Sequence, residues 1–205
     1  MEREYFEDMY ASSPDPWGFG SRWYEKRKYA LTLAALSRPR YESAFEPGCS
    51  IGVLTAQLAQ RCDHLLASDL IPSAVSQARK RVADLPHVEV REWDAHDAWP
   101  DERFDLVLVS EMLFFLDWDD AKRFASEAAI HLTPDGEILL VHWRPRVPEY
   151  PLSSDQAHEI ARAATGLSPQ SHYEDDDFIL DLLVPPGRQS VACQEGLREE
   201  HASID

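Results

Sequence analysis

The sequence predicts an α/β protein with a doubly wound, seven-stranded, mostly parallel sheet and an antiparallel terminal hairpin. Strand-like apolar segments alternate five times with segments of helical period, which is typical of such sheets. The segment Phe104–Ser110 is apolar almost throughout, as in a central parallel strand buried on both faces. Two further strand-like segments are joined only by the short link Asp175-Asp176-Asp177, which indicates the hairpin at the sheet edge.

The first half of the chain alternates helix and strand patterns behind an aromatic-rich leading segment. Residues 1–20 hold Tyr5, Phe6, Tyr10, Trp17 and Phe19, so we expect a segment that docks rather than a free tail. From Tyr24 to Leu36 the apolar residues recur at helical spacing, and Pro39 ends this helix. The next expected elements are strand Ser43–Phe45, helix Ile51–Gln60, strand His64–Asp69 and a helix from Pro72 to Ala83.

The second half continues the alternation and then changes its order. Its expected elements are strand His87–Trp93, strand Phe104–Ser110, helix 118–132 capped by Asp117, a turn at Thr133–Gly136, strand Glu137–Trp143, helix Ser154–Ala164, and strands Pro169–Tyr173 and Phe178–Val184. The segment after Pro185 is polar and shows little periodicity. We therefore predict an N-terminal lid segment at 1–23, a ligand-binding domain at 24–184 and a mobile tail at 185–205.

Composition and charge exclude several classes of protein. The length of 205 residues suits one domain with a sizeable core. The net charge of −17 repels nucleic acids and anionic membranes, either as a solvated acidic surface, which we favour, or as a field that attracts cationic substrates. The start of the sequence has no apolar segment typical of a signal peptide, and no apolar run is of membrane-spanning length. We therefore expect a soluble, cytoplasmic protein.

Cysteine and acidic patterns give no metal site. The three cysteines, Cys49, Cys62 and Cys193, form neither a zinc-binding spacing nor an even set for a disulfide framework. Cys49 lies in a glycine turn that favours a small side chain, and we do not expect a catalytic thiol there. The acidic run Glu174–Asp177 lacks the ligand pattern of a calcium loop, so we interpret it as a solvated hairpin turn and predict no metal.

The segment Phe45–Gly52, Phe-Glu-Pro-Gly-Cys-Ser-Ile-Gly, predicts a strand, a glycine turn and the start of a helix. The following apolar run ends in Asp69, so the two strands would present a carboxylate at one edge of the sheet. The spacing Gly48-x-x-x-Gly52 is not that of a dinucleotide site, no phosphate loop follows, and Glu46 would repel a pyrophosphate. A ligand with ribose hydroxyls and a cationic group fits better, and S-adenosylmethionine is the common ligand of that description.

This order of elements, with its terminal hairpin, resembles the Rossmann-like fold of class I S-adenosylmethionine-dependent methyltransferases over Tyr24–Val184. The resemblance rests on five motifs in order, namely Glu46–Gly52, the acidic Asp69, Trp93-Asp94-Ala95, Phe104–Glu111 and Leu132–Glu137. A narrower resemblance is to the nodulation protein S group. It is carried by Asp15-Pro16-Trp17-Gly18, by Tyr24-Glu25-Lys26-Arg27-Lys28-Tyr29 and by the motif around Glu46. The member that names this group N-methylates a free amine on a deacetylated chito-oligosaccharide.

The resemblance implies a set of residues at the cofactor. We expect contacts from Trp17, Tyr24, Lys28, Glu46, Gly48, Cys49, Gly52, Asp69, Leu70, Asp94, Ala95, Ser110, Glu111 and Met112. In this set the glycines would admit the methionine part, Asp69 would bind the ribose, and Asp94 with Ala95 would meet the adenine. Lys28 would meet the methionine carboxylate, and Trp17 would close a lid. The alternatives are an ordinary tight turn for the glycines, a helix cap for Asp69, a polar loop for Asp94 and a surface lysine for Lys28.

Two residues are candidates for the catalytic base. Glu111 follows the strand Phe104–Ser110, and His142 ends the strand Glu137–Trp143, so both border the predicted crevice. A carboxylate or an imidazole can take the proton of an ammonium, although each residue has a purely structural alternative. Arg144 is a candidate for binding the substrate or for an ion pair. His158 is a weaker candidate that we expect on a solvated helix face.

The predicted function is S-adenosylmethionine-dependent methylation of a small molecule, most simply an amine on a sugar or another polar metabolite. O-methylation of a small metabolite stays open, because it needs the same crevice and base. A catalytically silent, methyltransferase-like partner subunit is the alternative outside catalysis. The expected partner is a small-molecule substrate, with neither nucleic acid nor membrane, and the sequence leaves the oligomeric state open.

Overall fold

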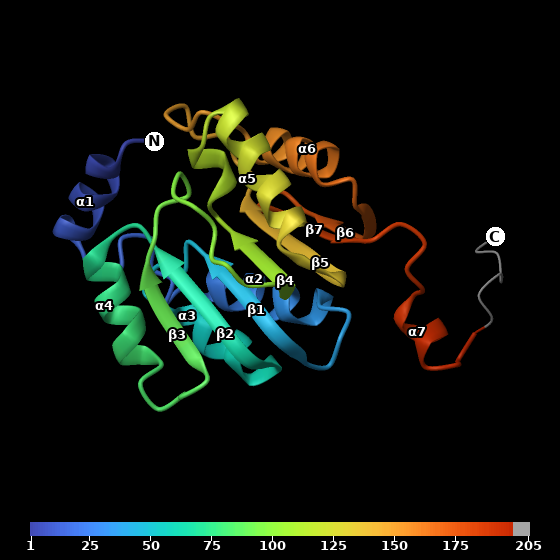
Figure 1. The fold of residues 1–205 in the computed structure, drawn as a ribbon. Coiled ribbons are helices and arrows are strands. Elements are labelled where there is room, and N and C mark those ends of the chain that lie inside the picture. The colour runs from blue at the N-terminus through green and yellow to red at the C-terminus, as the bar shows by residue number, and fades with distance from the viewer. Residues whose placement is uncertain (199–205) are drawn as a thin grey trace.

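The computed structural model describes residues 1–198 and contains a seven-stranded sheet in the order β3-β2-β1-β4-β5-β7-β6 (Figure 1). The strands are β1 (Tyr41–Pro47), β2 (Cys62–Asp69), β3 (Val88–Glu92), β4 (Phe104–Ser110), β5 (Leu132–Trp143), β6 (Ser168–Glu174) and β7 (Phe178–Val184). Strands β1 to β5 pair in parallel, whereas β7 runs antiparallel to both β5 and β6. This topology confirms the predicted fold class, including the antiparallel hairpin at the sheet edge.

Helices cover both faces of the sheet. They are α1 (Arg3–Ser12), α2 (Trp23–Ala35), α3 (Val53–Leu58), α4 (Pro72–Arg81), α5 (Trp118–Ile130), α6 (Ser154–Thr165) and α7 (Val191–Gln194), with 3-10 turns η1 (Ala59–Arg61) and η2 (Leu113–Phe115). Apolar residues of α2, α3 and α4 pack on one face, and those of α5 and α6 pack on the other. The strand ends that carry the sequence motifs therefore stay uncovered by these layers.

Local signals start the helices where the sequence predicts them. The Asp117 carboxylate accepts the Asp120 N–H at 2.9 Å and caps α5. Pro72 occupies the first turn of α4, where its missing N–H costs nothing. Helix α6 begins with a capping box in which the side chains of Ser153 and Gln156 each accept the other's backbone N–H.

Several predicted boundaries differ from the structure by one or more residues, and two of the differences have a clear local cause. Helix α3 begins at Val53 rather than Ile51, because Gly52 has a left-handed backbone with φ of +76°. The residues predicted as a turn, Thr133–Gly136, belong instead to β5, where Leu132 pairs with Phe104 and an irregularity in the pairing takes up the extra residues. These residues thus form an irregularity within the pairing of β4 and β5, and they do not lie outside the strand.

The segment behind β7 makes ordered contacts in its described part. Arg188 donates a hydrogen bond to the buried Glu137 carboxylate at 2.6 Å and another to the Ser37 hydroxyl at 3.0 Å. The short helix α7 follows it. The rest of the predicted tail, residues 199–205, lies outside the described residues. Within residues 1–198, no helix is both long enough and apolar enough to cross a membrane.

Candidate active site

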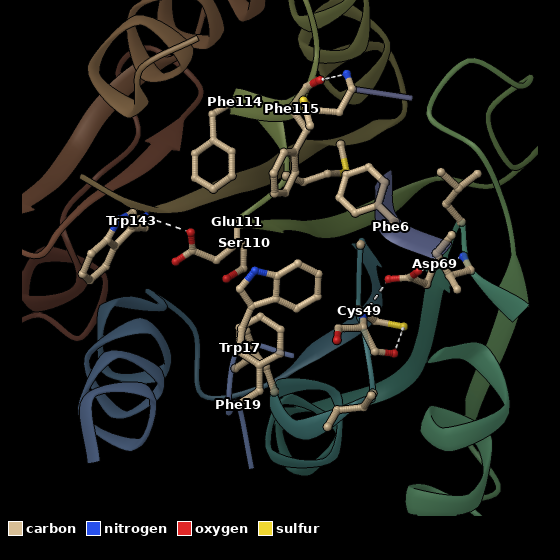
Figure 2. Close-up of a pocket in the computed structure, with 18 of the residues that line it drawn as sticks. Phe6, Trp17, Phe19, Cys49, Asp69, Ser110, Glu111, Phe114, Phe115 and Trp143 are labelled. Carbon is tan, nitrogen blue, oxygen red and sulfur yellow. Dashed lines mark hydrogen bonds between the residues drawn. The ribbon is translucent and has the colours of Figure 1, made fainter. Parts of the chain in front are cut away.

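The carboxyl ends of β1, β2 and β4 open into a cavity of about 470 Å³ (Figure 2). Of the predicted cofactor residues, all except Gly52 line this cavity: Trp17, Tyr24, Lys28, Glu46, Gly48, Cys49, Asp69, Leu70, Asp94, Ala95, Ser110, Glu111 and Met112. They come from distant parts of the sequence, which the parallel strands bring to one edge of the sheet. The volume of the cavity lies in the range of small-molecule sites.

Glu46 supplies a buried carboxylate with one oxygen that forms no hydrogen bond within residues 1–198. Glu46 lies at the carboxyl end of β1 and is 2% exposed. Its Oε2 atom forms no hydrogen bond within the described part of the chain. Burial raises the pKa of Glu46 to about 8, and the nearby Asp69 carboxylate adds to this shift. An unpaired buried acid is costly, so this position favours a cationic ligand that pairs with the carboxylate.

Asp69 ends β2 and faces the same cavity. Its Oδ2 accepts the Ser50 N–H at 2.8 Å, which Figure 2 shows as a dashed line, and its Oδ1 accepts the Ile71 N–H at 2.9 Å. Burial raises its pKa to about 6 although these hydrogen bonds oppose the shift. Each carboxylate oxygen can accept a second hydrogen bond, so Asp69 can still bind hydroxyl groups of a ligand.

The two glycines of the turn have different surroundings. Gly48 lines the cavity with φ of +74°, and a Cβ atom there would lie 3.3 Å from the Met112 side chain. Gly52 does not line the cavity, and a Cβ atom there would lie 3.0 Å from the Ala78 backbone in α4. The prediction that Gly52 touches the ligand is therefore not supported by its position. Its geometry instead permits the close approach of α3 and α4.

The loop behind β3 forms another wall of the cavity. The Asp94 Oδ1 atom accepts the His96 N–H at 2.9 Å and lies 2.6 Å from His96 Nδ1. His96 Nε2 lies 3.0 Å from the Asp120 carboxylate in α5, so the ring ties this loop to the start of that helix. The hydrogen bond with Asp94 raises the pKa of His96, and Asp120 contributes in the same direction. Asp94 and Ala95 are thus held at the cavity by contacts within the chain.

Glu111 follows β4 and has the strained φ of +56°, which is unusual for a residue with a side chain. Its Oε1 accepts a hydrogen bond from Lys28 Nζ at 2.5 Å, and its Oε2 accepts the Trp143 N–H at 2.8 Å. Figure 2 shows the carboxylate between Trp143 and Ser110. Both oxygens are fixed, so Glu111 presents a carboxylate of defined orientation to the cavity.

Lys28 is buried between two carboxylates of the chain. Its Nζ atom lies 2.9 Å from Glu25 Oε2 as well as 2.5 Å from Glu111 Oε1. Burial opposes its charge, but Glu111 and Glu25 together raise the pKa of Lys28 above its ordinary value. The alternative of a surface lysine is wrong, since the residue is 1% exposed. The sequence reasoning missed Glu25, although its spacing of three residues from Lys28 on a helix was a usable signal.

Aromatic side chains of the leading segment close the cavity. Trp17 stacks on Phe19 with ring centroids 5.6 Å apart, and Phe6 contacts Phe115 edge to face at 4.9 Å. In Figure 2, Trp17 and Phe19 lie on one side of the opening and Phe114 and Phe115 on the other. The leading segment therefore docks, as the sequence predicts. Tyr24 also lines the cavity, and its buried hydroxyl has no hydrogen-bond partner within residues 1–198.

His142 lies outside the cavity, contrary to the role predicted for it. Its ring is fully buried, its Nε2 accepts the Leu113 N–H at 3.1 Å, and its Nδ1 lies 2.9 Å from His158 Nε2. Burial holds the pKa of His142 well below its usual range. Because the accepting nitrogen is already used, His142 has no free base to offer a ligand. The prediction of a solvated His158 is also wrong, since that ring is fully buried.

The other candidate groups have structural partners. Cys49 is buried, and burial raises the pKa of its thiol well above the ordinary value, so the structure offers no thiolate nucleophile there. Arg144 pairs with Asp155 at 3.4 Å and with Glu174 at 3.4 Å, which supports the ion-pair alternative. In residues 1–198, the His, Cys, Asp and Glu side chains form no group that could hold a metal ion.

Comparison with known proteins gives sequence relatives over most of the chain. The family profile of nodulation protein S (NodS) matches residues 5–148. The chain is 28% identical to nodulation protein S of Rhizobium tropici over 130 residues, which are 62% of this chain and 55% of that protein. It spans about half the length of the nodulation proteins that it matches. It is also 30% identical to a protein-L-isoaspartate O-methyltransferase of Anaeromyxobacter dehalogenans (strain 2CP-C), covering 87% of this chain and 78% of that protein.

Solved structures with the same fold include two of particular interest. A candidate methyltransferase from Pseudomonas syringae is 43% identical and has a TM-score of 0.72, with 80% of this chain and 99% of that chain covered. The N-methyltransferase NodS from Bradyrhizobium japonicum WM9, in complex with S-adenosyl-L-homocysteine, has a TM-score of 0.81. It is 23% identical, with 89% of this chain and 97% of that chain covered, so this likeness concerns the fold.

Proposed function

This chain belongs to the nodulation protein S family, and from that premise we propose that it is an S-adenosylmethionine-dependent methyltransferase. The proposed acceptor is an amine on a sugar or another small polar molecule. In this proposal residues 24–184 bind the cofactor, and residues 1–23 form the lid. S-adenosylmethionine, when bound, supplies an electrophilic methyl group on a sulfonium.

The buried Glu46 carboxylate, with its Oε2 atom free of hydrogen bonds within residues 1–198, is the observation that carries the cofactor proposal. A buried acid at the end of β1 suits the ammonium of an amino acid, and it would repel a phosphate. Asp69 on the neighbouring strand would accept hydrogen bonds from ribose hydroxyls. Gly48 would leave room for the methionine part, and Asp94 with Ala95 would border the adenine. We assign Trp17, Cys49, Leu70, Ser110 and Met112 to the surrounding wall.

Glu111 is the proposed base. Methyl transfer to an amine needs a free lone pair, so a carboxylate beside the acceptor must first take a proton from the ammonium. Lys28 and the Trp143 N–H hold the Glu111 carboxylate in one orientation, which supports this role. Lys28 already has two carboxylate partners, and we therefore assign it to orienting Glu111 rather than to the methionine carboxylate. The aromatic lid would exclude water from the reacting groups.

The cofactor proposal is tested by calorimetric titration with S-adenosylhomocysteine. We expect Asp69→Ala to weaken binding by about 1–3 kcal/mol, because charge-assisted hydrogen bonds to the ribose are lost. The matched control is Asp63→Ala, which removes an exposed carboxylate at the other end of β2. Equal affinity for wild type and Asp69→Ala would refute the ribose contact. Binding of NAD with none of S-adenosylhomocysteine would refute the function.

The acceptor proposal is tested by methyl transfer to glucosamine, with N-acetylglucosamine as the control in which the amine is blocked. We expect methylation of glucosamine alone, and we expect Glu111→Gln to lower its turnover by about 100-fold while the affinity for S-adenosylhomocysteine stays near wild type. Equal methylation of both sugars would point to a hydroxyl acceptor. Binding of S-adenosylhomocysteine without transfer to any amine or hydroxyl would favour a silent partner subunit.

A further inference from the structure

A line of buried polar side chains crosses the core beneath the cavity. It begins at the Leu113 N–H, which donates to His142 Nε2 at 3.1 Å. His142 Nδ1 lies 2.9 Å from His158 Nε2, and His158 Nδ1 lies 2.7 Å from Asp181 Oδ2. The side chains of His142, His158 and Asp181 are all fully buried and come from β5, α6 and β7. Burying three ionisable groups costs free energy unless hydrogen bonds compensate it, so their arrangement calls for an explanation.

The hydrogen bonds define one protonation pattern. An amide can only donate, so His142 Nε2 must be the accepting nitrogen and Nδ1 must carry the hydrogen. That hydrogen points at His158 Nε2, which leaves the His158 hydrogen on Nδ1, directed at the Asp181 carboxylate. With both rings neutral and Asp181 ionised, every polar atom along the line has a partner. Burial lowers the pKa of both histidines, in agreement with neutral rings.

The outer end of the line is anchored by charge. Asp181 Oδ1 lies 2.8 Å from His172 Nδ1, and Asp181 Oδ2 lies 3.2 Å from Arg162 Nη1. His172 and Arg162 are partly exposed, so the buried carboxylate is compensated from the surface side. The negative charge of Asp181 in turn fixes the tautomer of His158, and through it that of His142.

The inner end of the line holds a wall of the cavity. Leu113 is the first residue of η2, where a helical N–H has no partner within the helix, and it is 1% exposed. Its neighbours Met112, Phe114 and Phe115 line the cavity, and the Phe114 ring also packs on His142 at 5.2 Å. His142 thus satisfies a buried N–H at the start of this wall.

A proton path to the cavity does not fit this geometry. The line ends on a backbone amide, which does not titrate. The Glu111 carboxylate hydrogen-bonds with Lys28 and the Trp143 N–H, and it has no recorded bond to His142. The arrangement therefore suits support of the wall better than transport of protons.

We propose that His142, His158 and Asp181 are positioning residues that fix η2 and with it the cavity wall formed by Phe114 and Phe115. The support of η2 does not depend on the reaction, whereas its effect on the acceptor rests on the proposed function. The direction of the hydrogen bonds explains this role. Only a His142 ring that accepts at Nε2 can bind the Leu113 N–H.

The test compares His142→Gln with His142→Asn by residue-resolved amide exchange in the full chain. A glutamine oxygen reaches the Nε2 position and keeps the Leu113 bond, whereas an asparagine reaches only the Nδ1 position. We expect the Leu113 amide to exchange near the wild-type rate in His142→Gln and about tenfold faster in His142→Asn. The Phe45 amide in the centre of the sheet reports global unfolding and should exchange alike in both variants. Equal Leu113 rates in both, or a parallel rise at Phe45, would overturn the proposal.

A measurement on the wild type covers the case in which a variant fails to fold. Nitrogen NMR of the rings should find His142 and His158 neutral, with hydrogen on Nδ1, at pH 7. An Nε2–H tautomer or a charged ring at His142 would overturn the proposal. With glucosamine as acceptor, His142→Asn should raise KM about tenfold and leave S-adenosylhomocysteine affinity unchanged. If wild type binds no S-adenosylhomocysteine, the proposed function fails, while the exchange and tautomer results still decide the support of η2.

Discussion

At the scale of single residues, the site is governed by carboxylates that the fold removes from water. Burial raises the pKa of Glu46 to about 8 and that of Asp69 to about 6. The Glu111 carboxylate, in contrast to Glu46, accepts hydrogen bonds from Lys28 and from the Trp143 N–H. A ligand cation would therefore form an ion pair with Glu46, and Glu46 would release its proton as this pair forms.

Glu46→Gln should make the ligand-free protein more stable at alkaline pH. The pKa of Glu46 is about 8 in the fold against an ordinary 4.5, so between these values only the folded state holds the proton. Stability from this group is complete below pH 4.5 and is lost as pH rises through 8. In urea unfolding, the advantage of Glu46→Gln over wild type should grow by about 1 kcal/mol per pH unit across that window.

The control for this prediction is Glu42→Gln, on the exposed part of the same strand. It removes a carboxylate from β1 without removing a buried one. An advantage of Glu46→Gln that stays constant from pH 5 to 8.5 would contradict the raised pKa. Glu46→Gln should also abolish the proton release that we expect when S-adenosylhomocysteine binds to wild type.

At the scale of elements, the turn between β1 and α3 combines two demands that look alike in sequence. Gly48 and Gly52 both have positive φ, at +74° and +76°. Only Gly48 borders the cavity, whereas Gly52 sets the distance from α3 to α4 through Ala78. A glycine spacing therefore predicts the turn but does not tell which glycine faces a ligand.

Gly52→Ala should destabilise the protein by about 2–4 kcal/mol, from backbone strain together with the 3.0 Å approach of its Cβ to Ala78. The matched control is Gly166→Ala at the end of α6, where φ is +67° and no atom lies within 4 Å of the added Cβ. That variant isolates the strain, for which we expect about 1 kcal/mol. Thermal and urea unfolding measure both, and equal losses would show that the approach to α4 costs nothing.

The strand bounds were predicted with unequal success. The segment Phe104–Ser110 matches β4 residue for residue, because a continuous apolar run is a direct record of burial on both faces. The turn prediction for Thr133–Gly136 was wrong, because these residues pack beside the start of β4. Thr133 donates a hydrogen bond to the Asp105 carboxylate, and a Cβ atom at Gly136 would lie 2.9 Å from the Phe104 carbonyl oxygen. Partners on another strand override local turn preference.

At the scale of the whole molecule, the core holds the buried polar line of His142, His158 and Asp181. Neutral rings are required there, and burial lowers the pKa of both histidines below the ordinary 6.5. Below pH 6.5 the unfolded chain therefore binds protons that the folded protein does not bind. Stability from this line is present above pH 6.5 and is lost as pH falls toward the lower pKa of the folded state.

Stability should therefore fall by up to about 1.4 kcal/mol per pH unit for each histidine as pH falls below the ordinary histidine pKa. Urea unfolding at pH 7, 6 and 5 measures the slope. His142→Gln should be less sensitive to acid than wild type, because one titrating ring is gone. The control is His87→Gln, which removes a histidine outside the line. The same slope in all three proteins would contradict neutral buried rings.

The sequence by itself determined the fold class, the hairpin at one edge of the sheet, and the strand ends at which the site forms. Those features follow from local sequence patterns, namely apolar periodicity and the residues that end each strand. Only the tertiary structure decided which groups meet. It joined Lys28 to Glu25 and Glu111, and it left Glu46 Oε2 without a hydrogen bond in the described part of the chain. It also placed His142 outside the cavity, in a line with His158. Such pairings join residues far apart in the sequence. A local sequence pattern does not predict whether a polar side chain faces a cavity or hydrogen-bonds to a neighbouring side chain.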